Sequence, residues 1–329
     1  MTKTLGMYAA SHAHIGDRLN ALGLNLDVVC FDKSGMFDID GAKQQPEDVE
    51  LDYLWLSSHL NPDKAMPTAF DVARRLKRLD VLQTFNAGLD NPAYGDISAK
   101  GVRICNSSAQ GVAIAEYVLG QVLAVLQPIE LQRQKQADKA WGVTRFREIS
   151  RTHWLIVGYG PIGEGVAKRA KAFGAKVSAL RRSSTPADHA DRTGLLKDGQ
   201  TFAPDADIVV LACPLTEATR GFAGKAFFDA LKPGAILVNI ARGGVIDDPA
   251  LIAAMDAGKV DRAILDVFHT EPLPADDPLW THPKVRITPH TSFAGDGVQD
   301  RWDTLFLDNI QRYVKGETLL REVDPSDIA

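Results

Sequence analysis

The chain has 329 residues, of which 45% are hydrophobic and 24% are charged, and its formal net charge is −5 at pH 7. This length favours about two domains, each large enough to bury its own core. The acidic balance argues against nucleic acid or anionic lipid as a partner, and no apolar run approaches the roughly 18 residues of a membrane span. Residues 1–10 lack the apolar stretch of a secretory signal, so we expect a cytoplasmic protein.

The first hundred residues alternate apolar runs with helical patterns. Strands are predicted at residues 5–10, 26–31, 51–56, 81–85 and 102–105. Apolar residues at helical spacing predict helices at residues 15–24 and 70–79. Strands that alternate with helices pair in parallel and are covered on both faces. We therefore predict a small, doubly wound α/β domain.

Two features of this chain invite a metal-site interpretation. Cys30, Cys105 and Cys213 lie far apart in apolar, strand-like runs, which indicates reduced core thiols. His12 and His14 follow the first predicted strand, but no cysteine or acidic partner at a ligand spacing accompanies them. We expect a polar turn at the two histidines and no metal.

A connecting segment at residues 112–139 has no strand signal and begins with apolar residues at helical spacing. Pro128 should kink or break this helix. A hinge and a dimer arm are both compatible with the pattern, which ends at Trp141 and Gly142.

A glycine-rich motif follows an apolar strand predicted at residues 152–157 and opens a helix predicted at residues 162–173. In this G-x-G-x-x-G spacing, one glycine permits a tight turn, the next lets backbone approach a pyrophosphate, and the last lets the helix pack on the strand. The helix N-terminus attracts phosphate. We take the whole run as cofactor-binding: Gly158, Tyr159, Gly160, Pro161, Ile162 and Gly163.

The rest of the chain completes a dinucleotide-binding unit. Further strands are predicted at residues 176–180, 208–212, 235–240, 262–267 and 285–287, with helices at 226–231 and 250–257. Together with the strand before the glycines they form a six-stranded Rossmann-type sheet. The tail at residues 298–313 has apolar residues at helical spacing, and we expect this helix to pack on the first domain.

The identity of the dinucleotide is indicated by the end of the second strand of this unit. An Asp or Glu there accepts hydrogen bonds from the adenosine ribose, but this chain has Arg181, Arg182 and Ser183, and its next carboxylate is Asp188. A guanidinium binds a 2′-phosphate, which a carboxylate would repel. A solvated surface loop is the plain alternative. We predict NADP(H) as the preferred cofactor and NAD(H) as the alternative.

Chemistry-bearing side chains follow three predicted strands, at the strand ends where open α/β sheets place their sites. They are Arg242, Glu271 and His290, a cation, a carboxylate and an imidazole. Each alone has a plain interpretation as a surface or turn residue. In the first domain, the small-residue turn at Ala87 and Gly88 exposes backbone N–H groups that could hold a carboxylate, or it is a plain loop.

From about Asn86 to Asp324 the chain resembles the D-isomer-specific 2-hydroxyacid dehydrogenases. The resemblance rests on four motifs: Cys213-Pro214-Leu215-Thr216, Arg242-Gly243-Gly244, Glu271-Pro272-Leu273-Pro274 and Pro289-His290. It implies a discontinuous, flavodoxin-like substrate domain at residues 1–110 and 295–329, a Rossmann cofactor domain at 111–294, an active site in the cleft, and a homodimer.

The resemblance also implies residue roles. His290 exchanges a proton with the carbonyl oxygen, and Glu271 pairs with it, because a neighbouring carboxylate stabilises an imidazolium. Arg242 binds the substrate carboxylate and carbonyl, and the N–H groups of Ala87 and Gly88 hold its other side. Asp266 anchors the nicotinamide carboxamide. The remaining cofactor contacts are assigned to Cys213, Pro214, Ile240 and Ala241.

The chain departs from the family pattern at Pro161, where many members have arginine, so a side-chain cation and one N–H are missing at the pyrophosphate. Its basic residues after the second strand resemble those of the NADPH-dependent glyoxylate and hydroxypyruvate reductases. In some such reductases a tryptophan crosses from the partner subunit, which Trp141 could do, although a lone tryptophan after a helix is more often a core residue.

We therefore expect an NADPH-dependent reductase of a small 2-oxo acid, with glyoxylate or hydroxypyruvate as first candidates. One alternative is an NAD-dependent dehydrogenase for a bulkier 2-hydroxy acid. Another, from a different class, is a dinucleotide-sensing binding protein like the corepressors of this fold, which keep similar residues. A formate dehydrogenase is disfavoured, since those enzymes place glutamine where Glu271 stands.

Overall fold

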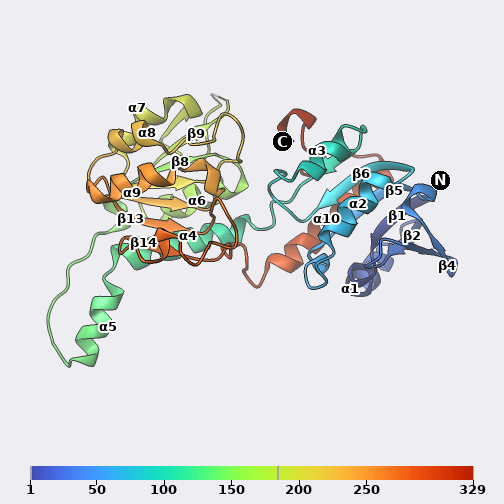
Figure 1. The fold of residues 1–329 in the computed structure, drawn as a ribbon, viewed down its shortest axis with the longest axis horizontal. Coiled ribbons are helices and arrows are strands. Elements are labelled where there is room, and N and C mark those ends of the chain that lie inside the picture. The colour runs from blue at the N-terminus through green and yellow to red at the C-terminus, as the bar shows by residue number, and fades with distance from the viewer. Residues whose placement is uncertain (1, 184, 329) are drawn as a thin grey trace. The chain divides into compact units, whose positions relative to one another are not determined.

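The structure is a computed structural model that describes residues 2–183 and 185–328. The chain separates into two compact units. Unit 1 comprises Met1–Ala109 and Asp296–Ala329, and unit 2 comprises Gln110–Gly295. Each unit is built on its own seven-stranded sheet (Figure 1).

Unit 1 has the strand order β4-β3-β2-β1-β5-β6-β7. Its strands are β1 (Lys3–Tyr8), β2 (Leu26–Phe31), β3 (Phe37–Ile39), β4 (Ala42–Gln44), β5 (Glu50–Leu56), β6 (Arg78–Thr84) and β7 (Arg103–Cys105). Its helices are α1 (Ala9–Asn20), α2 (Met66–Arg75), α3 (Pro92–Ser98) and α10 (Val298–Lys315). The five predicted strands are present and pair in parallel, which confirms the doubly wound arrangement.

The hairpin of β3 and β4 was not predicted, and it makes the sheet of unit 1 mixed rather than purely parallel. β3 pairs antiparallel with β2 and with β4. Each strand of the hairpin has three residues, and only Phe37 among them is buried. Strands this short and this exposed give no period-two signal in the sequence.

Helix α1 corrects the predicted polar turn at His12 and His14. The helix begins at Ala9, directly after β1, and ends at Asn20, so both histidines are helical and the predicted span of 15–24 is shifted. Its buried residues are Ser11, Ile15 and Leu19, spaced four apart. Because Ser11 is polar, the first turn of this buried face does not appear in the apolar pattern of the sequence. Helix α2 likewise lies at 66–75 and not at 70–79.

The tail helix α10 packs on unit 1, as predicted. Phe306 stacks on Trp55 with ring centroids 4.0 Å apart and an interplanar angle of 8°. Trp302 meets Phe85 edge-on at 5.3 Å. The C-terminal segment is therefore part of the core formed by the first hundred residues.

Unit 2 is an all-parallel sheet with the strand order β10-β9-β8-β11-β12-β13-β14. Its strands are β8 (His153–Val157), β9 (Lys176–Arg181), β10 (Arg192–Leu195), β11 (Ile208–Leu211), β12 (Ala235–Asn239), β13 (Val260–Leu265) and β14 (Val285–Ile287). Its helices are α4 (Gly111–Leu126), α5 (Ile129–Ala137), α6 (Pro161–Ala172), α7 (Gly199–Phe202), α8 (Lys225–Ala230) and α9 (Asp248–Asp256). The prediction of six strands missed the edge strand β10, none of whose residues is fully buried.

Alternate residues of the central strands of unit 2 enter two separate cores. Leu155 and Val157 of β8 belong to one core cluster, whereas Trp154 and Ile156 belong to the other. This alternation is expected for a sheet that is covered on both faces, and it explains why these strands are apolar throughout.

The connecting helix is broken at Pro128, as predicted. α4 ends at Leu126 with seven buried residues, whereas α5 begins at Ile129 and buries none. Among the described residues no single helix is long and apolar enough to cross a membrane, and α4 and α5 together meet that criterion only as a pair bent by 54°.

Candidate cofactor and active sites

Two glycines of the glycine-rich turn are required by the packing of the protein itself. Gly158 has a φ of +95°, and a Cβ there would lie 2.4 Å from the backbone nitrogen of Cys213. A Cβ on Gly163 would lie 2.2 Å from the carbonyl oxygen of Gly158. These contacts hold β8, β11 and the start of α6 closer together than any side chain permits.

Gly160, in contrast, is not required by any contact among the described residues. No heavy atom lies within 4 Å of a Cβ built on it, and its φ of −98° and ψ of −166° suit any residue. It is the N-cap of α6, whose first N–H groups have no acceptor within the helix. The open space, the glycine and the helix N-terminus fit a bound pyrophosphate.

The end of β9 lies beside this turn. The Tyr159 hydroxyl donates to the carbonyl oxygen of Asp188, and burial raises the pKa of Tyr159 to about 12, with the Arg181 guanidinium opposing the rise. Arg181 Nη1 donates to the carbonyl oxygen of Thr185 at 3.4 Å, a weak bond that a better acceptor would replace. Arg182 and Ser183 are exposed and Arg181 is half-buried, at the start of a loop that Tyr159 of the glycine-rich turn contacts.

Cys213 and Pro214 follow β11 and support the turn through their backbone. Burial raises the pKa of the Cys213 thiol to about 12, so this sulfur stays protonated and unreactive at neutral pH. The Thr219 hydroxyl donates to the carbonyl oxygen of Pro214 at 2.6 Å. All three cysteines are free, but only Cys105 and Cys213 are buried as expected, and Cys30 is half-buried.

Arg242 lies at the carboxyl end of β12, in a turn that the fully buried Asn239 organises. Asn239 Oδ1 accepts the N–H of Ala241 at 3.1 Å, and its Nδ2 donates to the carbonyl oxygen of Arg242 at 3.0 Å. Arg242 Nη1 donates to the carbonyl oxygen of Ala241 at 2.7 Å. Ile240 and Ala241, which precede Arg242, are each only 6% exposed.

Glu271 and His290 form the pair that the sequence predicts. His290 Nδ1 lies 2.7 Å from Glu271 Oε2, and Glu271 Oε1 accepts the N–H of Phe268 at 2.9 Å. Because a carboxylate only accepts, Nδ1 carries the proton of the first bond. The other ring nitrogen of His290, Nε2, is therefore the one that can act on a substrate, and 41% of the side chain is exposed.

Asp266, at the carboxyl end of β13, holds the His290 turn. His290 has a φ of +50°, an uncommon conformation for a residue with a side chain, and its N–H donates to the carbonyl oxygen of Asp266 at 2.8 Å. The carboxylate of Asp266 accepts the N–H groups of Thr291 and Ser292. Asp266 is fully buried, so its expected contact with a nicotinamide carboxamide stays a prediction, while its support of the turn is direct.

Three supporting residues were not identified from the sequence: Asn239, Tyr117 and Thr288. The Thr288 hydroxyl donates to Asp266 at 2.6 Å and lies 2.6 Å from the Tyr117 hydroxyl, which ties helix α4 to the turn. Asn239 had a signal, since it is the one polar residue in an otherwise apolar strand. Tyr117 had none, because it lies in a largely apolar helix and its partner Thr288 is 171 residues away.

The candidate substrate turn belongs to unit 1 and follows β6. The Asn106 amide donates to the carbonyl oxygen of Ala87 at 2.7 Å, and the Asn86 amide donates to the Tyr94 hydroxyl. Within the described part of unit 1, the backbone N–H groups of Ala87 and Gly88 have no acceptor. Side-chain hydrogen bonds thus hold the turn in place, while the N–H groups of Ala87 and Gly88 stay available to bind an anion.

Comparisons with known proteins agree with this geometry. The family description "D-isomer specific 2-hydroxyacid dehydrogenase, NAD binding domain" matches residues 119–292. D-3-phosphoglycerate dehydrogenase of Methanocaldococcus jannaschii is 33% identical over 252 residues, which are 75% of this chain and 48% of that protein, so the chain spans about half of its length. Glyoxylate/hydroxypyruvate reductase A of Arabidopsis thaliana is 31% identical over 75% of this chain and 79% of that protein.

A solved structure of a D-isomer specific 2-hydroxyacid dehydrogenase from Xanthobacter autotrophicus, in complex with NADPH and MES, superposes with a TM-score of 0.79. The two chains are 27% identical, and the comparison covers all of both. The similarity therefore covers the residues of both units and is not restricted to the glycine-rich turn.

Proposed function

Since this chain belongs to the D-isomer specific 2-hydroxyacid dehydrogenase family, we propose that it reduces a small 2-oxo acid to the D-2-hydroxy acid with NADPH, with glyoxylate or hydroxypyruvate as substrate. The observation that carries the proposal is the 2.7 Å pair of His290 and Glu271 at the strand ends of a dinucleotide-binding unit. Reduction of a carbonyl requires a proton donor of this kind. Because the corepressors of this fold keep similar residues, turnover is what separates the enzyme from a sensor.

The proposed reaction divides the work between three side chains. When bound, the reduced nicotinamide supplies a hydride to C2 of the 2-oxo acid. Imidazolium His290 donates a proton from Nε2 to the carbonyl oxygen, and Glu271 holds the ring through Nδ1 and stabilises its charge. Arg242 binds the substrate carboxylate and draws electron density toward the carbonyl oxygen, which favours attack at C2.

Two features support the NADPH preference in this proposal. The end of β9 carries Arg181 and Arg182 and no carboxylate, and Arg181 is already oriented into the loop beside the glycine-rich turn. Pro161 offers no cation or N–H at the pyrophosphate, so cofactor affinity rests more heavily on the 2′-phosphate. The Xanthobacter relative was solved with NADPH.

Arg181→Asp should reverse the cofactor preference. The carboxylate repels a 2′-phosphate and accepts from ribose hydroxyls, so kcat/KM with NADPH should fall by about 10- to 100-fold while that with NADH stays equal or rises. Steady-state assays with both cofactors test this. Pro161→Arg is the matched control, and it should improve NADPH use much less than Arg181→Asp harms it. An NADH preference in the unaltered enzyme would refute the assignment.

Gly160→Val should separate cofactor binding from folding. No heavy atom of the described residues lies within 4 Å of a Cβ built here, so the unfolding free energy should change by less than about 0.5 kcal/mol. The isopropyl group occupies the space assigned to the pyrophosphate, and the NADPH dissociation constant should rise at least about 10-fold. Urea unfolding and NADPH fluorescence titration measure the two effects. Gly158→Ala, which clashes with Cys213, should instead unfold the protein, and unaltered NADPH binding by Gly160→Val would contradict the site.

One panel of assays tests the proposed reaction against its rivals. NADPH oxidation is followed with glyoxylate, hydroxypyruvate, pyruvate and aryl-pyruvates, and the proposal expects the first two to be turned over best. Preference for aryl-pyruvates with NADH would favour a dehydrogenase for a bulkier 2-hydroxy acid. Tight NADPH binding without oxidation by any of them would instead establish a dinucleotide sensor.

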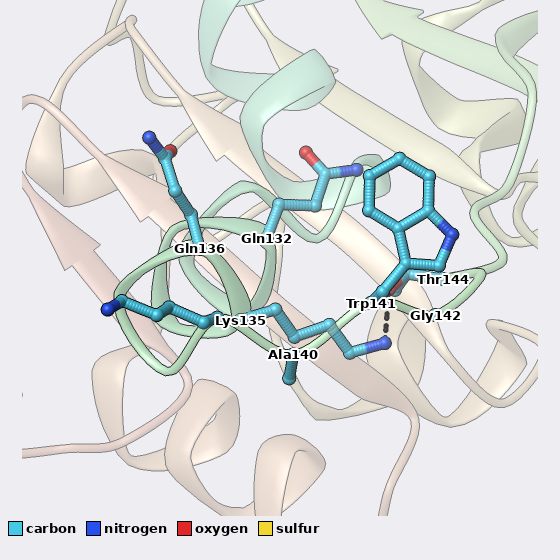
Figure 2. Close-up of a pocket in the computed structure, with 8 residues that line it drawn as sticks. Gln132, Lys135, Gln136, Ala140, Trp141, Gly142 and Thr144 are labelled. Atoms are coloured by element: carbon cyan, nitrogen blue, oxygen red, sulfur yellow. Dashed lines mark hydrogen bonds between the residues drawn. The ribbon is translucent and has the colours of Figure 1, made fainter.

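We further propose that the segment from α5 to Phe146, here called the arm, binds a second copy of this chain. α5 stands away from the rest of unit 2 (Figure 1) and buries none of its residues. Trp141 is fully exposed and Val143 is 91% exposed, so the core interpretation of Trp141 is wrong. Figure 2 shows Trp141 among the residues that line a pocket beside α5, where Lys135 donates to the Thr144 hydroxyl at 2.8 Å and ties the loop to the helix.

Trp141→Ser together with Phe146→Ser should therefore convert a dimer into a monomer, because large apolar side chains exposed to this degree on one segment are typical of a protein–protein contact. Light scattering coupled to gel filtration measures the mass. Phe173→Ser is the matched control, since Phe173 is 51% exposed outside the arm and should leave the mass unchanged. A monomeric unaltered protein would contradict the proposal.

A further inference from the structure

The loop that carries Glu271 is fastened to the turn that carries Arg242. A Cβ on Gly243 would lie 2.0 Å from the carbonyl carbon of Phe268, so the two backbones touch at this glycine. Next to this contact, His269 Nε2 lies 3.0 Å from the carbonyl oxygen of Ile246. Because a carbonyl oxygen only accepts, Nε2 carries the proton of this bond.

An acidic residue of α9 faces the same imidazole. Asp248, the first residue of α9, has its Oδ2 3.7 Å from His269 Nε2. Burial raises the pKa of Asp248, the imidazolium form of His269 lowers it, and Asp277 and Asp247 raise it further. The His269 ring is therefore contacted both by the Ile246 carbonyl oxygen and by the Asp248 carboxyl group.

The chain runs from this attachment directly to the proton-donating pair. Glu271, two residues after His269, is bonded through Oε1 to the Phe268 N–H and through Oε2 to His290. A displacement of this short loop moves the carboxylate away from His290 and changes its spacing from the Arg242 turn. Misplacement of reacting groups by about 1 Å costs on the order of 100-fold in rate.

We propose that His269 is a positioning residue, which holds the Glu271 loop against the Arg242 turn through the Ile246 carbonyl oxygen and Asp248. It acts on the reaction through Glu271 and sets the distance between the carboxylate-binding and proton-donating groups. The role rests on the proposed 2-oxo acid reduction, but the attachment itself is present without substrate.

The test compares His269→Ala, which removes the bond, with His269→Gln, which keeps an N–H donor at the same reach. His269→Ala should lower kcat about 10-fold with the KM for NADPH unchanged, and it should move the alkaline loss of activity to lower pH, because a loosened Glu271 stabilises the imidazolium less. His269→Gln should stay within about two-fold of the unaltered enzyme. His282→Gln is the matched control, since His282 also faces an aspartate, Asp256 at 3.9 Å, but has no connection to Glu271.

A second readout needs no turnover. Nitrogen-15 NMR of the histidine rings reports the bond from His290 Nδ1 to Glu271, and its signal should shift in His269→Ala and stay unchanged in His282→Gln. If the unaltered protein reduces no 2-oxo acid, the proposed function is refuted. The His290 NMR signal then decides by itself whether His269 positions Glu271. A folded His269→Ala with unchanged kcat and an unchanged His290 signal would overturn it. Should the alanine variant fail to fold, His269→Asn, which is too short to reach the Ile246 carbonyl oxygen, replaces it.

Discussion

His290→Ala should lower kcat for 2-oxo acid reduction by about 1,000-fold, because it removes the proposed proton donor to the carbonyl oxygen. Its ring projects from a turn that Asp266 fixes, and Nδ1 is occupied by Glu271 at 2.7 Å. Single-turnover measurements of NADPH oxidation test this. NADPH binding, measured by fluorescence, should be unchanged, since the proposed cofactor contacts lie elsewhere.

Controls for this result are available in the same unit. His282→Ala removes a half-buried histidine that also pairs with an aspartate but lies outside the proposed site, and it should keep normal turnover. Glu271→Gln keeps the shape of its side chain and removes its charge, so it should reduce kcat less than His290→Ala does. Full activity in His290→Ala would refute the assigned proton donor.

Arg242→Ala should lower kcat/KM for the 2-oxo acid by about 1,000-fold, because a bidentate pair of charge-assisted hydrogen bonds to the substrate carboxylate is lost. Arg242→Lys keeps the charge without the planar fork and should recover about 10-fold of that loss. The backbone of the turn is held by Asn239, so neither variant should alter folding. Equal kcat/KM values for the arginine and alanine enzymes would contradict the role.

The features of the fold and the site that could be predicted are those that depend on short stretches of sequence. The glycine spacing, the apolar strands of unit 2 and the break at Pro128 are short-range features with a direct physical cause. Arg242, Glu271 and His290 could be grouped because the carboxyl ends of parallel strands meet at one edge of a sheet. The structure brings His290 Nδ1 and Glu271 Oε2 to 2.7 Å, while the catalytic roles of the two residues stay predictions.

What the sequence did not predict depends on contacts between distant segments or on weak local patterns. The buried face of α1 contains Ser11, which reads as polar, so the helix start was placed six residues late. The exposure of Trp141 follows from the whole course of the arm, whereas composition alone favours burial. The hydrogen bond between His269 and the Ile246 carbonyl oxygen joins residues 23 apart, and no residue spacing or periodicity in the sequence indicates it.

The most direct test of the central claim follows the hydride itself. The enzyme is incubated with hydroxypyruvate and NADPH that carries deuterium at both C4 positions of the nicotinamide ring, and the product is analysed by mass spectrometry and chiral chromatography. The account predicts D-glycerate with one deuterium at C2. Unlabelled product, the L isomer, or no product despite tight NADPH binding would contradict it.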